Sequence, residues 1–185
     1  MKTKNEIRKE LKALIAELTP EEKRIQSTLR CEKLLHDPGI LTAKSLGIYL
    51  PLPDEPDLRP ALQILLEKGM RIALPYPEKS EPALVPFDRP WAFHWITDLT
   101  PIQNGPWNLP FPEAGEQVAA TELDIILVPG RGFTPQGQRI GRGKGYYDRL
   151  LADHQGRRIG MGFSCQLRDS LPEEPHDIPL TEIWT

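Results

Sequence analysis

Cysteine is scarce in this chain of 185 residues, which holds only Cys31 and Cys165. Two thiols so far apart in the sequence predict neither a disulfide framework nor a zinc site. Because free cysteines are usually buried, we expect both to be free thiols in or near the core. The histidines are not spaced as metal ligands, and we expect them at the surface or in packing contacts. They are His36, His94, His154 and His176.

Long apolar runs are also missing. No stretch approaches the roughly 18 apolar residues that indicate a membrane-spanning helix. The first residues are charged and lack the apolar segment of a signal peptide. The net charge is only -3, which argues against a protein that binds nucleic acid nonspecifically. Together with the scarce cysteine, these absences predict a cytoplasmic protein that has neither a membrane nor a nucleic acid as its partner.

The spacing of apolar residues predicts alternating helices and strands. Helical spacing occurs over residues 4–17, 20–36, 58–68 and 145–154. Short β-prone runs occur over residues 45–50, 71–75, 123–128 and 158–163. We therefore expect an α/β fold, a single three-layer domain spanning residues 1–185 with a mostly parallel sheet flanked by helices.

Several local signals refine this prediction. Thr19, followed by Pro20 and Glu22, predicts a helix start with a capping box. Gly69 is expected to close the third helix. The run 123–128 is nearly all apolar, as in a parallel strand that is covered on both faces. The many prolines between residues 51 and 112 predict turns, with strand-like pieces from 83 to 97 and a loop over 105–110.

The most informative segment spans residues 128–148, between the strand 123–128 and the last predicted helix. Within it, glycines alternate with an arginine and a lysine over residues 141–145. Glycine lets backbone N–H groups approach an anion closely, and successive N–H groups form a concave anion site. Ligands of open α/β sheets bind outside the carboxyl ends of strands, which is where this loop stands. The segment therefore predicts phosphate binding, with Arg139 adding positive charge.

Other interpretations of this loop stay open at the level of the residues. It is not a Walker A loop, because Gly145 follows Lys144 where that motif needs Ser or Thr, and the Rossmann glycine spacing also fails. A tight turn with solvated basic residues is the alternative to phosphate binding. Asp148 suits either the positive end of a helix or a Mg²⁺ ion. Tyr146 and Tyr147 suit either the core or a flat ligand ring.

The string from Gly141 to Asp148, preceded by Gly-Gln-Arg-Ile, closely resembles the signature of the 5-formyltetrahydrofolate cyclo-ligases, also called methenyltetrahydrofolate synthetases. The eight-residue string is highly specific, and the resemblance extends over nearly the whole chain. Further segments that resemble the family lie at residues 4–8, 49–55, 107–110 and 176–179.

The resemblance implies a ligase of one-carbon metabolism that uses ATP and Mg²⁺ to cyclise 5-formyltetrahydrofolate to 5,10-methenyltetrahydrofolate. Its partners would be these small-molecule substrates, and we expect a monomer or a homodimer. Lys4 and Arg8 resemble a family pair that reaches the ATP phosphates, and their spacing puts both on one helix face. The implied ATP loop comprises Arg139, Ile140, Gly141, Arg142, Gly143, Lys144, Gly145, Tyr146 and Tyr147.

The resemblance also implies the folate and metal contacts. The implied folate contacts are Leu50, Glu55, Trp107, Tyr146 and Tyr147, and the implied metal carboxylates are Asp148 and Asp177. Without the resemblance, Glu55 would be read as a surface carboxylate and Trp107 as a core or loop anchor. In the same way, Lys4 and Arg8 would be read as a solvated basic face. His176 is placed to touch the site through Asp177.

Two positions depart from the family pattern. This chain has Thr134 and Thr181 where family members commonly have Asp, and either change would weaken a metal or loop contact. Two other functions are kept as alternatives. One is a relative of sugar-phosphate isomerases or sugar kinases that uses the glycine loop to bind a substrate phosphate. The other, to which the two threonines point, is a regulatory protein that binds a nucleotide without turnover.

Overall fold

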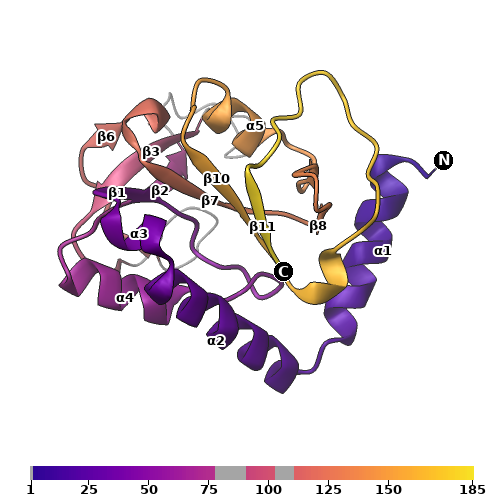
Figure 1. Cartoon of the computed structure of the whole chain (residues 1–185), viewed down its shortest axis with the longest axis horizontal. Helices are drawn as coiled ribbons and strands as arrows, with labels where there is room; N and C mark the ends of the chain where they lie inside the picture. The colour runs from indigo at the N-terminus through magenta and orange to yellow at the C-terminus, as the bar shows by residue number, and fades with distance from the viewer. Residues whose placement is uncertain (1, 78–90, 103–110) are drawn as a thin grey trace.

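The computed structural model describes residues 2–77, 91–102 and 111–185. Its α-helices, labelled in Figure 1, are α1 (Lys4–Glu17), α2 (Pro20–His36), α3 (Pro38–Thr42), α4 (Arg59–Glu67) and α5 (Tyr146–Leu151). Its strands are β1 (Ser45–Gly47), β2 (Arg71–Pro77), β3 (Trp91–Ile96), β4 (Pro101–Ile102), β5 (Phe111–Pro112), β6 (Gln117–Val118), β7 (Ile125–Pro129), β8 (Gly132–Phe133), β9 (Arg139–Ile140), β10 (Arg157–Met161) and β11 (Glu182–Trp184). Short 3₁₀ helices follow β6 (η2, Ala120–Glu122) and β10 (η3, Ser164–Gln166).

The main sheet is mixed and mostly parallel. Its strand order is β11-β10-β7-β1-β2-β3-β6. The strands from β11 to β2 pair in parallel, whereas β3 and β6 are antiparallel to their neighbours. Helices α2, α3 and α4 run together along one side of the molecule, and α5 lies apart from them (Figure 1). The prediction of an α/β fold with a mostly parallel sheet flanked by helices is confirmed.

Strand β7 lies inside this sheet and is buried on both faces. Ile125 and Leu127 belong to an apolar cluster that also contains residues of α2 and α4. Their neighbours Ile126 and Val128 belong to a second cluster, which includes Leu151 of α5. This alternation follows from the period of two along a strand. The expectation of a strand covered on both faces is therefore confirmed, although the strand begins at Ile125.

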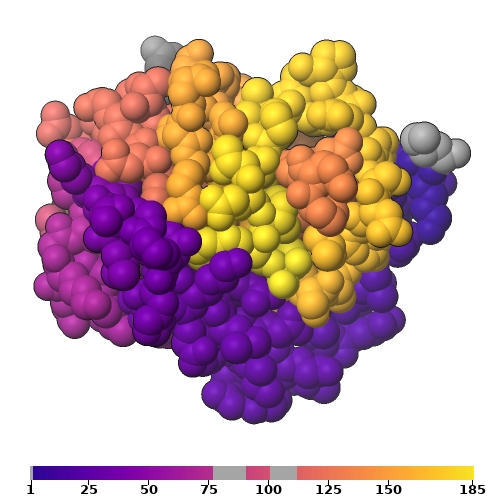
Figure 2. All heavy atoms as spheres, viewed as in Figure 1, coloured from indigo at the N-terminus to yellow at the C-terminus, as the bar shows by residue number. Residues whose placement is uncertain are grey.

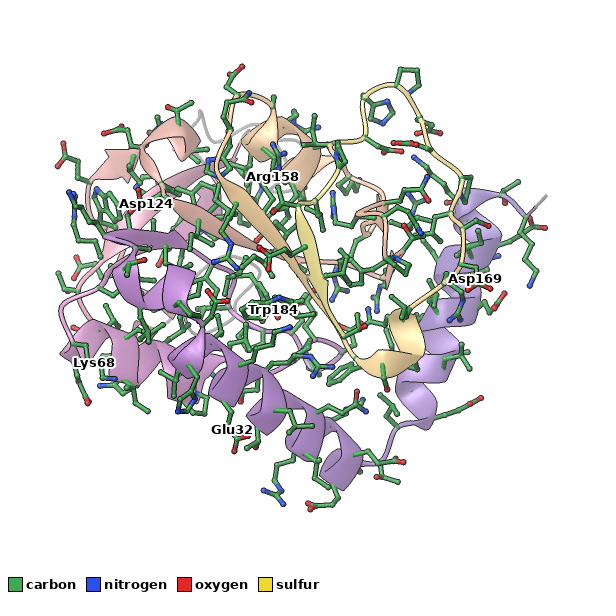
Figure 3. All side chains as sticks on the ribbon, in the orientation of Figure 1. Glu32, Lys68, Asp124, Arg158, Asp169 and Trp184 are labelled. Atoms are coloured by element: carbon green, nitrogen blue, oxygen red, sulfur yellow. The ribbon has the colours of Figure 1, made fainter. Side chains whose placement is uncertain are left out.

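Asp124, labelled in Figure 3, sets the register between β7 and β1. Its Oδ2 accepts hydrogen bonds from the backbone N–H of Lys44 at 2.7 Å and of Ser45 at 3.1 Å. The hydroxyl of Ser45 in turn accepts from the N–H of Asp124 at 3.0 Å. This exchange fixes the starts of both strands, so their carboxyl ends finish at the same edge of the sheet. The loops that leave this edge carry the candidate site.

The predicted helix ends are largely confirmed. The hydroxyl of Thr19 accepts from the N–H of Glu22, whose carboxylate accepts from the N–H of Thr19 at 2.7 Å, which completes the capping box. Gly69 follows α4 with a φ of 84°, a left-handed conformation that favours glycine. Both signals depend on residues that are close together in the sequence, which is why they could be predicted from the sequence alone.

Other boundaries differ from the prediction because tertiary contacts decide them. Strand β1 ends at Gly47 rather than at residue 50. Its partner strand β2 contains Pro75, which has no N–H to donate to β1, so the hydrogen bonding between the two strands stops there. Helix α5 ends at Leu151 rather than at His154. His154 is buried, and its Nδ1 lies 2.8 Å from the carbonyl oxygen of Ala120, which turns the chain out of the helix.

Among the elements that were not predicted are α3, the β8–β9 hairpin and β11. Strand β11 has only three residues, too few for a periodic pattern, yet it pairs with β10 along its length. Figure 2 shows these last residues packed beside the indigo N-terminal part of the chain. Arg30 of α2 makes this contact by donating to the carbonyl oxygen of Trp184 at 3.2 Å.

Three remaining expectations concern single features. Cys31 is buried and Cys165 is partly buried, and both are free thiols, as predicted. The predicted loop over residues 105–110 lies outside the described residues, as does the part of 83–97 that precedes β3. Within the described part of the chain, no helix has the length and apolar character needed to cross a membrane.

Candidate active site

One cavity of about 560 Å³ opens beside the loops that follow β1 and β7. Every predicted site residue that the structure describes lines it. They are Lys4, Arg8, Leu50, Glu55, Arg139, Ile140, Gly141, Arg142, Gly143, Lys144, Gly145, Tyr146, Tyr147, Asp148 and Asp177. The remaining predicted residue, Trp107, lies outside the described residues. The structure thus brings these side chains together, and their individual roles stay predictions.

The glycine loop adopts backbone conformations that explain its composition. Gly143 has a φ of 100° and Gly145 a φ of 64°, both in the left-handed region that other residues rarely adopt. At Gly141 a β-carbon would lie 2.7 Å from Nη1 of Arg139, so a side chain would collide with that guanidinium. These glycines therefore let residues 141–145 fold back closely over the cavity. Helix α5, which follows, is short at six residues.

Helix α1 contributes two cations to one side of the cavity. Nε of Arg8 donates to the carbonyl oxygen of Gly141 at 3.0 Å, which fastens the helix to the glycine loop. Nζ of Lys4 lies 2.5 Å from Asp177 and 2.9 Å from Glu174. Although burial alone would lower the pKa of Lys4, its hydrogen bonds and charge interactions with these carboxylates raise it. Lys4 therefore stays charged at the mouth of the cavity.

Arg139 is the most deeply buried cation of the site, with a side chain that is only 5% exposed. Its Nη2 donates to Asp148 at 2.9 Å, and its Nη1 donates to the carbonyl oxygen of Pro129 at 3.3 Å. Its Nε is buried without a partner among the described residues. Contacts with Asp148 and Pro129 therefore hold the Arg139 guanidinium in place at the wall of the cavity.

The predicted metal carboxylates lie on this cavity but in separate ion pairs. Asp148 pairs with Arg139, and Asp177 pairs with Lys4. Ligand atoms of Glu174, His176 and Asp177 lie within 4.8 Å of one another. Carboxylate oxygens fit Mg²⁺, which prefers oxygen ligands and usually retains waters and substrate phosphate oxygens. His176 lines the cavity itself, and its Nε2 lies 3.3 Å from Glu174 and 4.0 Å from Asp177.

Glu55 and two tyrosines form the other side of the cavity. The Glu55 side chain is only 7% exposed, and its Oε2 accepts from the N–H of Leu52 at 3.0 Å. The hydroxyl of Tyr147 is buried without a partner in the described part of the chain. Burial and the nearby charge of Glu55 raise the pKa of Tyr147, so this hydroxyl keeps its proton. The ring centres of Tyr146 and Trp91 lie 5.3 Å apart, with the two ring planes tilted by 39°.

Among the residues at or behind the cavity wall that sequence reasoning missed are Asp54, Trp91, Arg131 and Glu174. Trp91 begins β3, which the antiparallel pairing with β2 brings to the cavity. No pattern in the sequence predicts that pairing. Asp54 precedes Glu55 directly, and the presence of two adjacent acidic residues was the one available signal.

The two departures from the family pattern have structural explanations. Thr134 is fully buried, and its hydroxyl accepts from the N–H of Gln138 at 3.2 Å, which closes the β8–β9 turn. Thr181 exchanges hydrogen bonds with the backbone of Arg158, its hydroxyl accepting at 2.9 Å and donating at 3.0 Å. Neither threonine is among the residues that line the cavity. Thr134 therefore supports the loop, and Thr181 supports the edge of β10.

Comparisons with known proteins identify relatives of this chain. The sequence profile of the 5-formyltetrahydrofolate cyclo-ligase family matches residues 1–185. The 5-formyltetrahydrofolate cyclo-ligase of Mycolicibacterium smegmatis is 32% identical over 78% of this chain and 75% of that protein. The probable 5-formyltetrahydrofolate cyclo-ligase of Caenorhabditis elegans is 28% identical over 97% of this chain and 91% of that protein.

A solved structure supports the same relationship. The 5,10-methenyltetrahydrofolate synthetase of Aquifex aeolicus superposes with a TM-score of 0.81 and 31% identity, covering 97% of this chain and 88% of that one. Sequence profile and fold therefore agree over nearly the full length. This chain belongs to the 5-formyltetrahydrofolate cyclo-ligase family.

Proposed function

We propose that this protein converts ATP and 5-formyltetrahydrofolate to 5,10-methenyltetrahydrofolate, ADP and phosphate in the cavity described above. The observation that carries the proposal is that one cavity joins a cationic glycine loop to Glu55 and Tyr147. Its volume of about 560 Å³ lies within the usual range of ligand pockets. Phosphates and a pterin ring can therefore meet at one place.

The reaction needs activation of a poor electrophile. The formyl carbon of the substrate is an amide carbon, because N5 donates electrons into the carbonyl group. Transfer of the γ-phosphoryl group from ATP to the formyl oxygen gives a phosphorylated intermediate and ADP. N10 then attacks the formyl carbon and loses its proton, and the oxygen leaves with the phosphoryl group as phosphate. No side-chain nucleophile is required for these steps.

The cationic residues suit the phosphoryl transfer. Charge that develops on the transferred group is stabilised best by fixed donors in a water-poor site. Arg139, Lys144 and the backbone of residues 141–145 would bind the phosphates, with Lys4 and Arg8 of α1 closing one side. The buried position of Arg139 at the cavity wall supports this assignment, since Asp148 and the carbonyl oxygen of Pro129 fix its guanidinium there.

The opposite wall suits the folate. Leu50 and the ring of Tyr147 offer apolar surface for a flat pterin, and Glu55 offers a carboxylate to its N–H groups. Holding N10 near the formyl carbon would supply a proximity contribution to the rate. Tyr146 and Trp107 are assigned here by resemblance alone.

Mg²⁺ is the expected metal of this site. Asp148 and Asp177 would hold it, with Glu174 nearby, and it would supply positive charge at the phosphate oxygens. Each of these carboxylates is paired with a cation in this structure. Arg139 and Lys4 would therefore share the aspartates with the metal when a nucleotide is bound.

A product assay tests the proposal. The purified protein is mixed with 5-formyltetrahydrofolate, ATP and Mg²⁺, and the absorbance of the methenyl product is followed. We expect product only when ATP is present, and a strong decrease after chelation of divalent cations. With ¹⁸O in the formyl group, the label should appear in the released phosphate. ATP binding without product, or turnover of a phosphosugar without ATP, would contradict the proposal.

A further inference from the structure

Arg142 bridges two loops that come from different parts of the sheet. Its Nε donates to Oε1 of Glu55 at 3.2 Å, and its Nη2 donates to the same oxygen at 2.8 Å. Nη2 also donates to Oδ1 of Asp54 at 2.5 Å, and Nη1 donates to Oδ2 at 3.4 Å. All nitrogens of this guanidinium therefore face carboxylates of the loop after β1. The resemblance, in contrast, assigns Arg142 to the ATP phosphates.

Asp54 has a second cationic partner, Arg131, which stands behind the cavity. Nη1 of Arg131 donates to Oδ2 of Asp54, and the Arg131 side chain is only 11% exposed. Neither residue is among those that line the cavity. Asp54 thus contacts Arg142 from outside the cavity. A residue in this position can affect a ligand only through Arg142.

Arg131 is in turn fixed to the framework of the protein. Its N–H donates to the carbonyl oxygen of Ile140 at 2.7 Å. Its own carbonyl oxygen accepts from Nε2 of Gln166 at 3.0 Å, and Gln166 is 1% exposed. A continuous set of contacts therefore leads from the buried Gln166 through Arg131 and Asp54 to Arg142.

The glycines around Arg142 explain why such support is needed. Gly141 and Gly143 flank it, and a long side chain on such a backbone loses considerable conformational entropy when it is fixed. Two adjacent carboxylates would also repel each other, and the charge of Arg131 balances the second one. Although burial would raise the pKa of Asp54, hydrogen bonds and charges from Arg142 and Arg131 lower it, so this carboxylate stays ionised.

We propose that Asp54, held by Arg131, is a positioning residue that fixes Arg142 on Glu55, so that Arg142 serves the folate side of the cavity. The inference rests on the proposed function, because it assigns these residues a part in that reaction. With Arg142 in place, the Glu55 carboxylate is charge-balanced and held in one orientation toward the pterin. Loss of Asp54 leaves Arg142 to move with the glycine loop.

The first experiment compares Asp54→Asn with Asp57→Asn as a matched control. Asp57 lies on the same loop, but it pairs with the exposed Arg59 at 2.7 Å. We expect Asp54→Asn to raise KM for 5-formyltetrahydrofolate about tenfold, while KM for ATP changes less than about twofold. Asp54→Glu, which keeps the charge, should recover most of the loss. Asp57→Asn should behave as the wild type.

A second experiment asks whether Asp54 acts through Arg142. In an Arg142→Ala background, Asp54→Asn should cause no further increase in KM for the folate. An equal increase in both backgrounds would overturn the inference, as would an equal effect on both substrates or a result identical to that of Asp57→Asn. Absence of product with the wild-type enzyme would instead overturn the proposed function.

Discussion

Lys144 is the residue whose charge is most directly assigned to the nucleotide. It stands between Gly143 and Gly145, whose positive φ values place this part of the loop over the cavity. A lysine that contacts phosphate makes hydrogen bonds between charged groups, which contribute about 1.5–3 kcal/mol each. The charge at this position therefore has an effect that can be measured in binding.

Replacement of Lys144 by alanine should weaken ATP binding by about tenfold or more, because a charge-assisted contact is lost. Lys33→Ala is the control, since Lys33 lies on α2 with its ammonium 4.3 Å from the centre of the Trp184 ring. Titration calorimetry with ATP measures both variants. Equal effects of the two substitutions would contradict the assignment of the loop.

Tyr147 offers a second test at the scale of one residue. Its hydroxyl is buried without a partner among the described residues, and such a group destabilises the free protein. We expect Tyr147→Phe to leave the free energy of unfolding unchanged or raise it by up to about 1 kcal/mol. KM for the folate should stay as in the wild type, because the hydroxyl has no surface open to the cavity and the ring that lines it is kept. A clear loss of stability or a raised KM would contradict this prediction.

At the scale of elements, the glycine loop and helix α1 form the cationic side of the site. Gly143 and Gly69 both have positive φ, at 100° and 84°. Only Gly143 lies on the cavity, whereas Gly69 ends α4, and a β-carbon there would meet open space. A comparison of substitutions at the two positions therefore separates the loss of stability caused by backbone strain from an effect on the site.

Alanine at Gly143 or at Gly69 should cost about 1–3 kcal/mol of stability, since each forces a side chain into the left-handed region. Only Gly143→Ala should also weaken ATP binding, because relaxation of the strained backbone at this position would shift a loop that lines the cavity. Urea unfolding and ATP titration on both variants test this. Weaker ATP binding in Gly69→Ala would contradict it.

Helix α1 is held to the C-terminal loop by Lys4 and Asp177. Burial alone would raise the pKa of Asp177, but its hydrogen bonds and the charge of Lys4 lower it below its usual value. A carboxyl with a lowered pKa stabilises the folded state at neutral pH, and this contribution disappears as the pH falls through the lowered value.

The wild type should therefore lose more stability than Lys4→Met when the pH falls from neutral to about 3. At neutral pH, Lys4→Met should be less stable by about 1 kcal/mol, since the pair is only partly buried. Lys12→Met, an exposed change on the same helix, is the control. Urea unfolding at both pH values gives the comparison. A parallel loss in wild type and Lys4→Met would rule out the ion pair as the cause.

At the scale of the whole molecule, the sequence predicts what depends on local pattern. The helix start at Thr19 depends on residues three positions apart, and the order of helices and strands implies the parallel sheet. Parallel strands end at one edge, so the loops after β1 and β7 had to meet. The family resemblance then supplied Lys4 and Asp177, which lie 173 residues apart.

Contacts between side chains from distant segments could not be predicted in this way. Asp54 and Arg131 are 77 residues apart, and their pairing depends on the rotamers of both side chains. The end of α5 depends on where His154 becomes buried, and the place of Trp91 depends on the pairing of β3 with β2. These features follow from packing, for which the sequence carries no periodic signal.

The central claim is that one cavity holds the nucleotide phosphates and the pterin at the same time. A crystal structure of the protein with a non-hydrolysable ATP analogue, Mg²⁺ and 5-formyltetrahydrofolate tests it most directly. The account predicts phosphate density at the backbone of residues 141–145 and the pterin beside Glu55 and Tyr147, with the formyl oxygen facing the γ-phosphate. Either ligand bound outside this cavity would contradict the account.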